Sequence, residues 1–274
     1  TASGTFGYGL EFAPFFDLSR IGGVVVKGIS PRPRSGNPPP RIVETPSGML
    51  NAIGLQNVGV RRFVEEKLPE LRRHDTAVIV NVYGHSVEDY VEVAEQLEGH
   101  AGLHGLELNL SCPNVKEGGV VIGRSAVETE KVTRAVRDAS SLPLWVKLTP
   151  NVTDVTELAR AAVAGGADAL SLVNTFFGMV IDVEKRRPVL ANGVGGLSGP
   201  AIRPMAVAMA HDVSRAVEVP VIGIGGIVRA RDVVEFLLAG ARAVQIGTAN
   251  YNDPAISARV AEELETWCAA RGVE

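Results

Sequence analysis

The sequence predicts an α/β protein whose parallel strands close into a (β/α)8 (TIM) barrel, and three observations support that prediction. Short apolar runs rich in β-branched residues alternate with segments of helical apolar period, the pattern of a parallel sheet covered by helices. The length of 274 residues is close to the roughly 250 that such a barrel needs and fits one domain spanning 1–274. The 30 glycines fall at the ends of the apolar runs, where tight strand-to-helix turns are expected.

Seven segments are expected to be strands of this barrel. They are 23–29, 77–83, 105–110, 144–148, 169–173, 220–224 and 243–246. The chain begins with the small residues Thr1 to Gly4, which we interpret as the end of a first strand whose beginning lies upstream, so that this strand is truncated in the given sequence. An open doubly wound sheet is the alternative, but no GxGxxG motif opens a helix after an early strand.

Helices are expected over 87–97, 127–139, 155–164 and 230–239, where apolar residues recur with a period of 3.6. Ser86 and Thr153 are the expected N-caps of the first and third of these helices. The segment 31–56, rich in proline and glycine, is expected to be a long functional loop. Segment 195–200 is expected to be a further loop at the same end of the barrel.

Composition excludes several classes of function. With 27 Lys and Arg against 31 Asp and Glu, the net charge of −4 provides no basic surface for nucleic acid. No 18-residue apolar run or secretion signal is present, so we expect a soluble, cytoplasmic protein. The two cysteines, Cys112 and Cys268, are too few for a disulfide framework or a cysteine-ligated metal site, and no metal is expected. His100 and His104 lie among glycines, and no P-loop or GxSxG motif occurs.

Polar residues stand at the end of nearly every predicted strand. They are Lys27, Asn81, Asn109, Lys147, Asn174 and Thr175. In a (β/α)8 barrel the active site forms at the carboxyl ends of the strands. Buried lysines and amides gathered at one mouth need hydrogen-bonding partners, and a planar heterocycle would supply them.

The last two predicted strands end in glycine, at 223–226 and at Gly247 followed by Thr248. Loops at this position commonly present backbone N–H groups to a phosphate. The sequence therefore indicates a phosphate-bearing ligand. Cys112, just after the strand at 105–110, could act there as a proton-abstracting base or as a nucleophile, whereas Cys268 is expected to pack or to lie at the surface.

Four ordered motifs resemble class 1 dihydroorotate dehydrogenase over essentially the whole chain. They are MLNAIGLQN at 49–57, NLSCPN at 109–114, VKLTPN at 146–151 and GGLSGP at 195–200. The residues at 49–57 and 148–150 resemble those of the 1B subclass, the catalytic subunit of an NAD-linked enzyme.

The resemblance implies an FMN in the barrel mouth with the substrate lying flat on it. Substrate contacts are then expected from Lys27, Asn51, Gly54, Leu55, Asn109, Asn114, Asn174 and Thr175. Flavin contacts are expected from Ala2, Ser3, Gly4, Lys27, Asn81, Asn109, Lys147, Val173, Gly196, Gly225, Gly226, Gly247 and Thr248. Cys112 is the expected catalytic base and Lys27 a second catalytic residue.

The family's reaction is the oxidation of (S)-dihydroorotate to orotate in pyrimidine biosynthesis. Cys112 is expected to take a proton from C5 while the flavin takes a hydride from C6, with 115–122 as a lid. In the 1B subclass, electrons pass to NAD through a partner subunit that carries FAD and a [2Fe–2S] cluster, in a heterotetramer built on a homodimer.

Four alternatives remain open at this point. One is a flavoenzyme like dihydropyrimidine dehydrogenase, which usually has His in place of Asn114, and another is the fumarate-using 1A subclass. A third is a flavin-free isomerase or lyase with a Schiff base at Lys147. The fourth is a degenerate barrel that only binds a ligand.

Overall fold

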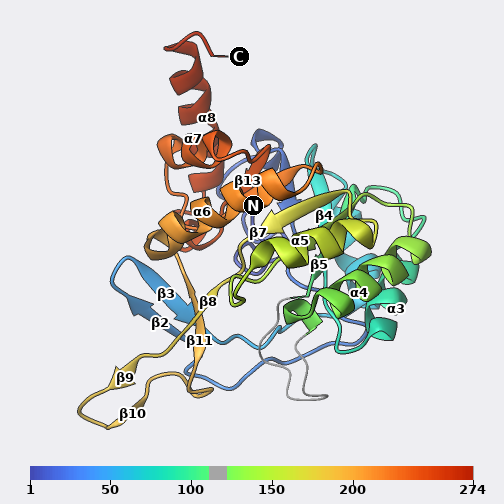
Figure 1. Ribbon diagram of the computed structural model, residues 1–274, viewed down its shortest axis with the longest axis horizontal. Coiled ribbons are helices and arrows are strands. Elements are labelled where there is room, and N and C mark those ends of the chain that lie inside the picture. Colours follow the sequence, from blue (N-terminus) through green and yellow to red (C-terminus); the bar gives the residue numbers. More distant parts are fainter. Residues whose placement is uncertain (111–121, 274) are drawn as a thin grey trace.

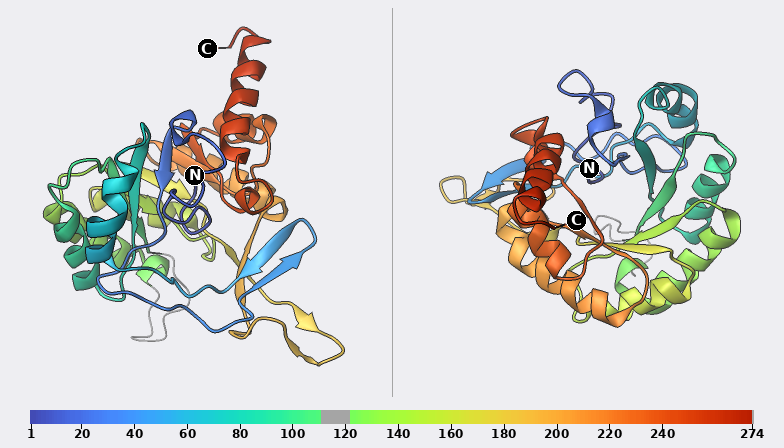
Figure 2. Two further views of the ribbon diagram at one scale, coloured as in Figure 1. Left: turned by 180° about the vertical axis from the view of Figure 1, so that it is seen from behind. Right: turned by 90° about the horizontal axis from the view of Figure 1, so that it is seen from above.

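The structure, a computed structural model, describes residues 1–110 and 122–273 and is built on a parallel sheet of seven strands. The strands are β1 (Gly23–Val25), β4 (Ala77–Val82), β5 (Gly105–Asn109), β6 (Leu144–Lys147), β7 (Ala169–Leu172), β12 (Val221–Ile224) and β13 (Ala243–Gln245), hydrogen-bonded in that order. Viewed from above, the sheet curls and the helices form a ring outside it (Figure 2). All seven predicted strands are confirmed, each somewhat shorter than predicted.

The two edges of the curled sheet are bridged by the first residues of the chain. The Thr1 nitrogen donates to the Gly23 carbonyl on β1 at 2.9 Å. The Ala2 N–H donates to the Ile246 carbonyl, just after β13, at 2.8 Å. Residues 1–2 therefore contact both edges of the sheet, at the position where an eighth strand was expected.

Six longer helices cover the outside of the sheet (Figure 1). They are α3 (Val87–Leu97), α4 (Ala126–Ala139), α5 (Val155–Ala164), α6 (Arg203–Ala216), α7 (Ala230–Leu238) and α8 (Ile256–Ala269). Shorter helical segments are α1 (Val60–Arg62), η2 (Phe63–Lys67), α2 (Leu68–Leu71), η1 (Leu18–Arg20), η3 (Ile122–Arg124), η4 (Pro200–Ile202) and η5 (Thr248–Tyr251). No helix among residues 1–110 and 122–273 is long and apolar enough to cross a lipid bilayer.

The predicted helix starts are half confirmed. Ser86 caps α3, since its hydroxyl accepts from the Asp89 N–H at 3.3 Å. Thr153 is wrong as the cap of α5. The cap is Asp154, whose carboxylate accepts from the Thr156 N–H at 2.8 Å and so satisfies a first-turn donor that has no partner within the helix.

Two segments that were predicted to be loops contain strands. Segment 31–56 holds the hairpin β2 (Ile42–Thr45) and β3 (Gly48–Asn51), and 195–200 begins with β11 (Gly195–Ser198). With β8 (Phe176–Gly178) they form a four-stranded antiparallel sheet in the order β2-β3-β11-β8, which we call the antiparallel arm. A small hairpin of β9 (Ile181–Asp182) and β10 (Arg187–Pro188) extends beyond it (Figure 1). Pairing β3 with β11 joins residues about 145 positions apart, which no local pattern reveals.

Strand β5 shows how the curled sheet places polar groups on its inner face. Leu106 and Leu108 belong to the buried hydrophobic core, and Glu107 and Asn109 alternate with them. Because successive strand residues point to opposite faces of a sheet, the two polar side chains face inward and the leucines face the helices. The inner face of the curled sheet thus carries polar side chains toward the carboxyl end of β5.

Candidate active site

A cavity of about 170 Å³ lies at the carboxyl ends of the parallel strands. Twelve of the predicted site residues line it: Ser3, Gly4, Lys27, Asn51, Gly54, Leu55, Asn81, Asn109, Lys147, Asn174, Thr175 and Gly196. The sequence reasoning missed six further lining residues, which are Thr5, Gly28, Met49, Ile53, Ser198 and Tyr251. The structure therefore brings most of the predicted residues to one place, although they come from eight separate stretches of the chain.

A second cavity of about 470 Å³ shares Met49 and Tyr251 with the first. Gly226, Gly247 and Thr248 line it, so the predicted phosphate loops lie beside the polar cavity. Among the backbone-to-backbone hydrogen bonds of the described residues, none is donated by the N–H groups of these three. Clustered backbone donors without backbone acceptors favour an anion.

Three predicted flavin contacts line neither cavity. Ala2 and Val173 are buried, and Ala2 is used in the bond to the Ile246 carbonyl that bridges the sheet edges. Gly225 packs against α6, where a Cβ would come within 2.8 Å of the Ala206 Cβ. Their predicted contacts to a flavin stay predictions.

Cys112, Asn114 and residues 115–121 of the predicted lid at 115–122 lie outside the described residues. The structure places the strand that leads to them, because β5 ends at Asn109, which lines the cavity. It also places the segment that follows, where η3 begins at Ile122. The roles of Cys112 and Asn114 stay predictions.

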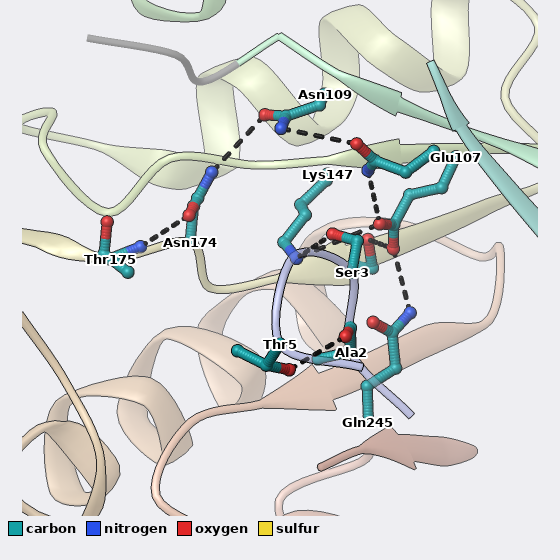
Figure 3. Close-up of polar contacts among 11 residues, drawn as sticks. Ala2, Ser3, Thr5, Glu107, Asn109, Lys147, Asn174, Thr175 and Gln245 are labelled. Atoms are coloured by element: carbon teal, nitrogen blue, oxygen red, sulfur yellow. Dashed lines mark hydrogen bonds and ion pairs between the residues drawn. The ribbon is translucent and has the colours of Figure 1, made fainter. Parts of the chain in front are cut away.

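Lys147 carries a buried positive charge at the floor of the cavity. Its side chain is 6% exposed, and Nζ lies 3.8 Å from Glu107 Oε1 and 3.1 Å from Ser3 Oγ (Figure 3). Glu107 is completely buried and was not singled out from the sequence. The sequence does contain a sign of its role, since this glutamate stands between two leucines of a strand. A charged side chain in a buried strand requires polar partners.

Three asparagine side chains form a hydrogen-bonded row along the cavity. Asn109 Nδ2 lies 3.5 Å from Asn81 Oδ1, and Asn174 Nδ2 lies 3.4 Å from Asn109 Oδ1 (Figure 3). The row ends at the Thr175 backbone N–H, which donates to Asn174 Oδ1 at 2.8 Å. Such amides offer both donors and acceptors to the edge of a heterocycle.

Lys27 places a second ammonium group on the cavity wall, just after β1. Burial lowers the pKa of Lys27 below its ordinary value of 10.5, Arg41 lowers it further, and Glu11 opposes the shift. An ammonium that is partly removed from water gains from an anionic partner. This position therefore suits the carboxylate of a ligand.

The antiparallel arm supplies the opposite wall with small groups and backbone. Asn51 on β3 donates to the Gly196 carbonyl on β11 at 3.5 Å. Gly196 leaves no room for a side chain, because a Cβ there would collide with Thr175 Oγ1. Leu55 has a φ of 57°, in the left-handed region, and its carbonyl accepts from Asn57 Nδ2 at 2.8 Å. A non-glycine residue held in this region is often part of a functional site.

The two cavities together match a flat ligand that carries a phosphate at one end. Lysine, hydroxyl and amide groups surround the first cavity, and glycine backbone surrounds the second. A side chain at Gly226 would collide with the Gly199 carbonyl, and φ there is +70°, so this loop keeps its bare backbone. The residues thus fit a flavin mononucleotide, the cofactor that the resemblance implies.

The comparisons with known proteins agree with this geometry. The family model described as dihydroorotate dehydrogenase matches residues 1–267. The chain is 57% identical over 274 residues to a protein of Geobacter sp. (strain M21), covering 100% of this chain and 90% of that protein. It is 58% identical over 273 residues to one of Geotalea uraniireducens (strain Rf4), with the same coverage. Both relatives are named dihydroorotate dehydrogenase B (NAD(+)), catalytic subunit.

Proposed function

Because the chain belongs to the dihydroorotate dehydrogenase family, we propose that it oxidises (S)-dihydroorotate to orotate, a step of pyrimidine biosynthesis, with FMN as its cofactor. The main support for this proposal is the pair of neighbouring cavities, which share Met49 and Tyr251. Lys27, Lys147 and a row of amides meet there, beside glycine loops whose backbone suits a phosphate. A substrate with a carboxylate and a flat amide ring fits those groups.

The chain's own residues divide the work of holding FMN. Ser3, Asn81 and Lys147 would bind the ring, and Gly226, Gly247 and Thr248 would bind the phosphate. When bound, the flavin supplies an acceptor for the hydride that leaves the substrate. Lys147 would provide a fixed positive charge for that ring, which requires no rearrangement during the reaction.

The substrate is held by a cation and amides. Lys27 would pair with the carboxylate, while Asn51, Asn109 and Asn174 would hydrogen-bond the ring, helped by Thr175. Asn114 and the backbone at Gly54 and Leu55 complete the proposed set. Fixing both ends of the molecule presents one face of its ring to the cofactor, which is how positioning lowers a barrier.

Cys112 is the proposed base. As a thiolate it takes the proton from C5, the hydride leaves C6 with its electron pair, and the C5–C6 double bond forms. Lys27 supports this step by holding the carboxylate next to the reacting carbons. Residues 115–122 are the proposed lid over the site, and closing it would exclude water.

The sheet is proposed to be that of a closed (β/α)8 barrel forming one FMN-binding domain over 1–274. The support is that Thr1 and Ala2 hydrogen-bond to both edge strands, which is the position of an eighth strand. Ala2, Val173 and Gly225 remain in the proposed set of flavin contacts.

The electron acceptor is proposed to be NAD, reached through a partner subunit with FAD and a [2Fe–2S] cluster. The relatives' names support this, because they state "NAD(+)" and "catalytic subunit". We further propose a homodimer within a heterotetramer, located in the cytoplasm with the rest of pyrimidine synthesis. A purified chain that rapidly reduces fumarate and never associates with a flavoprotein would contradict this assignment.

The base is tested by replacing Cys112. Cys112→Ala is expected to lower orotate formation by about 100-fold or more while FMN stays bound, because a general base contributes roughly that much. Cys112→Ser is expected to retain weak activity that rises with pH, since a hydroxyl is a poorer acid than a thiol. Turnover of Cys112→Ala equal to that of the unchanged chain would refute the role.

A further inference from the structure

Beneath the cavity, Glu107 on β5 receives donors from three other strands. Its Oε1 accepts from Asn81 Nδ2 at 2.7 Å, and its Oε2 accepts from Ser171 Oγ and from Gln245 Nε2, both at 2.8 Å. The Lys147 ammonium lies 3.8 Å from Oε1 (Figure 3). A fully buried acid with three donors and a cation around it has the partners that a carboxylate anion needs.

The hydrogen bonds of the amide row all run in the same donor-to-acceptor direction, and Glu107 is the acceptor at one end of the row. The Thr175 backbone N–H can only donate, so Asn174 presents its oxygen there and its NH2 to Asn109. Asn109 accordingly presents its NH2 to Asn81 Oδ1, and Asn81 presents its NH2 to Glu107. An ionised carboxylate can only accept, so both ends of the row fix the same orientation.

Glu107 itself does not line the cavity, whereas Asn81, Asn109, Lys147 and Asn174 do. We propose that Glu107 is a positioning residue that holds the Lys147 ammonium and the Asn81 amide, and through Asn81 the amides of Asn109 and Asn174, in the arrangement that the site uses. The proposal rests on the proposed function, since it assigns these four side chains to flavin and substrate.

The charge of Glu107 matters most for Lys147. In the described part of the chain, the side-chain groups that contact the Lys147 ammonium are Glu107 and Ser3, and only Glu107 is an anion. A buried ammonium that loses its counter-ion is costly, so it moves or gives up its proton. Either response would remove a charge-assisted hydrogen bond from the flavin site.

Glu107→Gln tests the effect of the negative charge alone, because it removes the charge and keeps the shape of the side chain. The glutamine oxygen can still accept from Asn81, and its NH2 can face Ser171 and Gln245. The hydroxyl of Ser171 can rotate to accept, and Gln245 Oε1 has no hydrogen-bond partner among the described residues. The packing and the amide row are thus expected to survive while the negative charge is lost.

The test is the affinity of the purified full chain for FMN, measured by the quenching of FMN fluorescence on binding. Glu107→Gln is expected to weaken FMN binding by about 10-fold or more, the worth of one charge-assisted hydrogen bond. Glu107→Asp, which keeps the charge, should recover part of this affinity.

Ser171→Ala is the matched control, because it removes one hydrogen bond from the same carboxylate and leaves its charge. It is expected to bind FMN within about 2-fold of the unchanged chain. If Glu107→Gln behaves like Ser171→Ala in FMN affinity, Glu107 only satisfies buried donors and the proposal is wrong. In that case orotate formation by the unchanged chain would still support the proposed function.

A double variant keeps the proposal testable if Glu107→Gln does not fold. Lys147→Met with Glu107→Gln removes both charges of the pair. If Glu107 acts on the flavin through Lys147, the double variant should bind FMN as Lys147→Met alone does. If adding Glu107→Gln to Lys147→Met lowers the affinity for FMN by a further 10-fold, Glu107 does not act on the flavin through Lys147.

Discussion

The two walls of the cavity are built in opposite ways. The rim of the parallel sheet supplies polar side chains such as Lys147 and Asn81, which are buried and both contact the Glu107 carboxylate. The antiparallel arm supplies glycine, backbone and Asn51, and its outer strands carry exposed apolar residues such as Phe177. The rim therefore sets the electrostatics of the site, and the arm sets its shape. Changes on the rim should alter charge-dependent behaviour, while changes on the arm should alter fit.

Among changes to the two walls, we expect the strongest effect where they meet. Gly196→Ala would drive a methyl group into Thr175 Oγ1 and push the arm away from the rim. We expect kcat/KM for dihydroorotate to fall by about 100-fold, because displacements near 1 Å have that effect. Steady-state assays of orotate formation measure it.

Gly22→Ala is the matched control for this substitution, since nothing lies within 4 Å of the place that its methyl group would take and no positive φ is involved. It should keep the kcat/KM of the unchanged chain. Full activity of Gly196→Ala would mean that the arm does not form the wall we describe.

A smaller effect separates charge from fit on the rim. Because the pKa of Lys27 is lowered by burial, its ammonium loses its proton at a lower pH than an ordinary lysine. Orotate affinity is expected to be constant while Lys27 is protonated and to fall as the pH rises through its lowered pKa, below 10.5. Titrating the flavin absorbance with orotate at several pH values measures this.

Lys27→Arg provides the comparison, because a guanidinium stays charged across this range. Its orotate affinity should be weaker but independent of pH up to the same limit. An identical alkaline loss in both proteins would assign the titration to another group.

The smallest effect is expected outside both walls. Ser86→Ala removes the cap of α3, which lies in the outer ring of helices, and should cost about 1 kcal/mol of unfolding free energy. Urea unfolding measures the loss, and Ser86→Asn, which can still cap, should recover most of it. Orotate formation should not change, and a parallel loss of activity would show that the ring of helices and the site are coupled.

The same contrast explains what the sequence could predict. The parallel strands are apolar β-branched runs, so β4 and β6 were visible locally, and Asn81 and Lys147 stood out because they interrupt those runs. The arm was missed, since its central pairing joins β3 to β11, and only the folded chain brings these two strands together. Glu107 was missed for a related reason. Its partners Ser171 and Gln245 come from strands far along the chain. Only the folded structure brings these donors to the Glu107 carboxylate.

The proposed reaction can be observed in the visible spectrum of the purified chain, recorded before and after dihydroorotate is added without oxygen. We expect a yellow protein whose oxidised-flavin band is lost, with one orotate formed for each flavin reduced. A colourless protein that cannot be loaded with FMN, or a yellow one whose spectrum dihydroorotate leaves unchanged, would refute flavin-dependent oxidation of dihydroorotate by this chain.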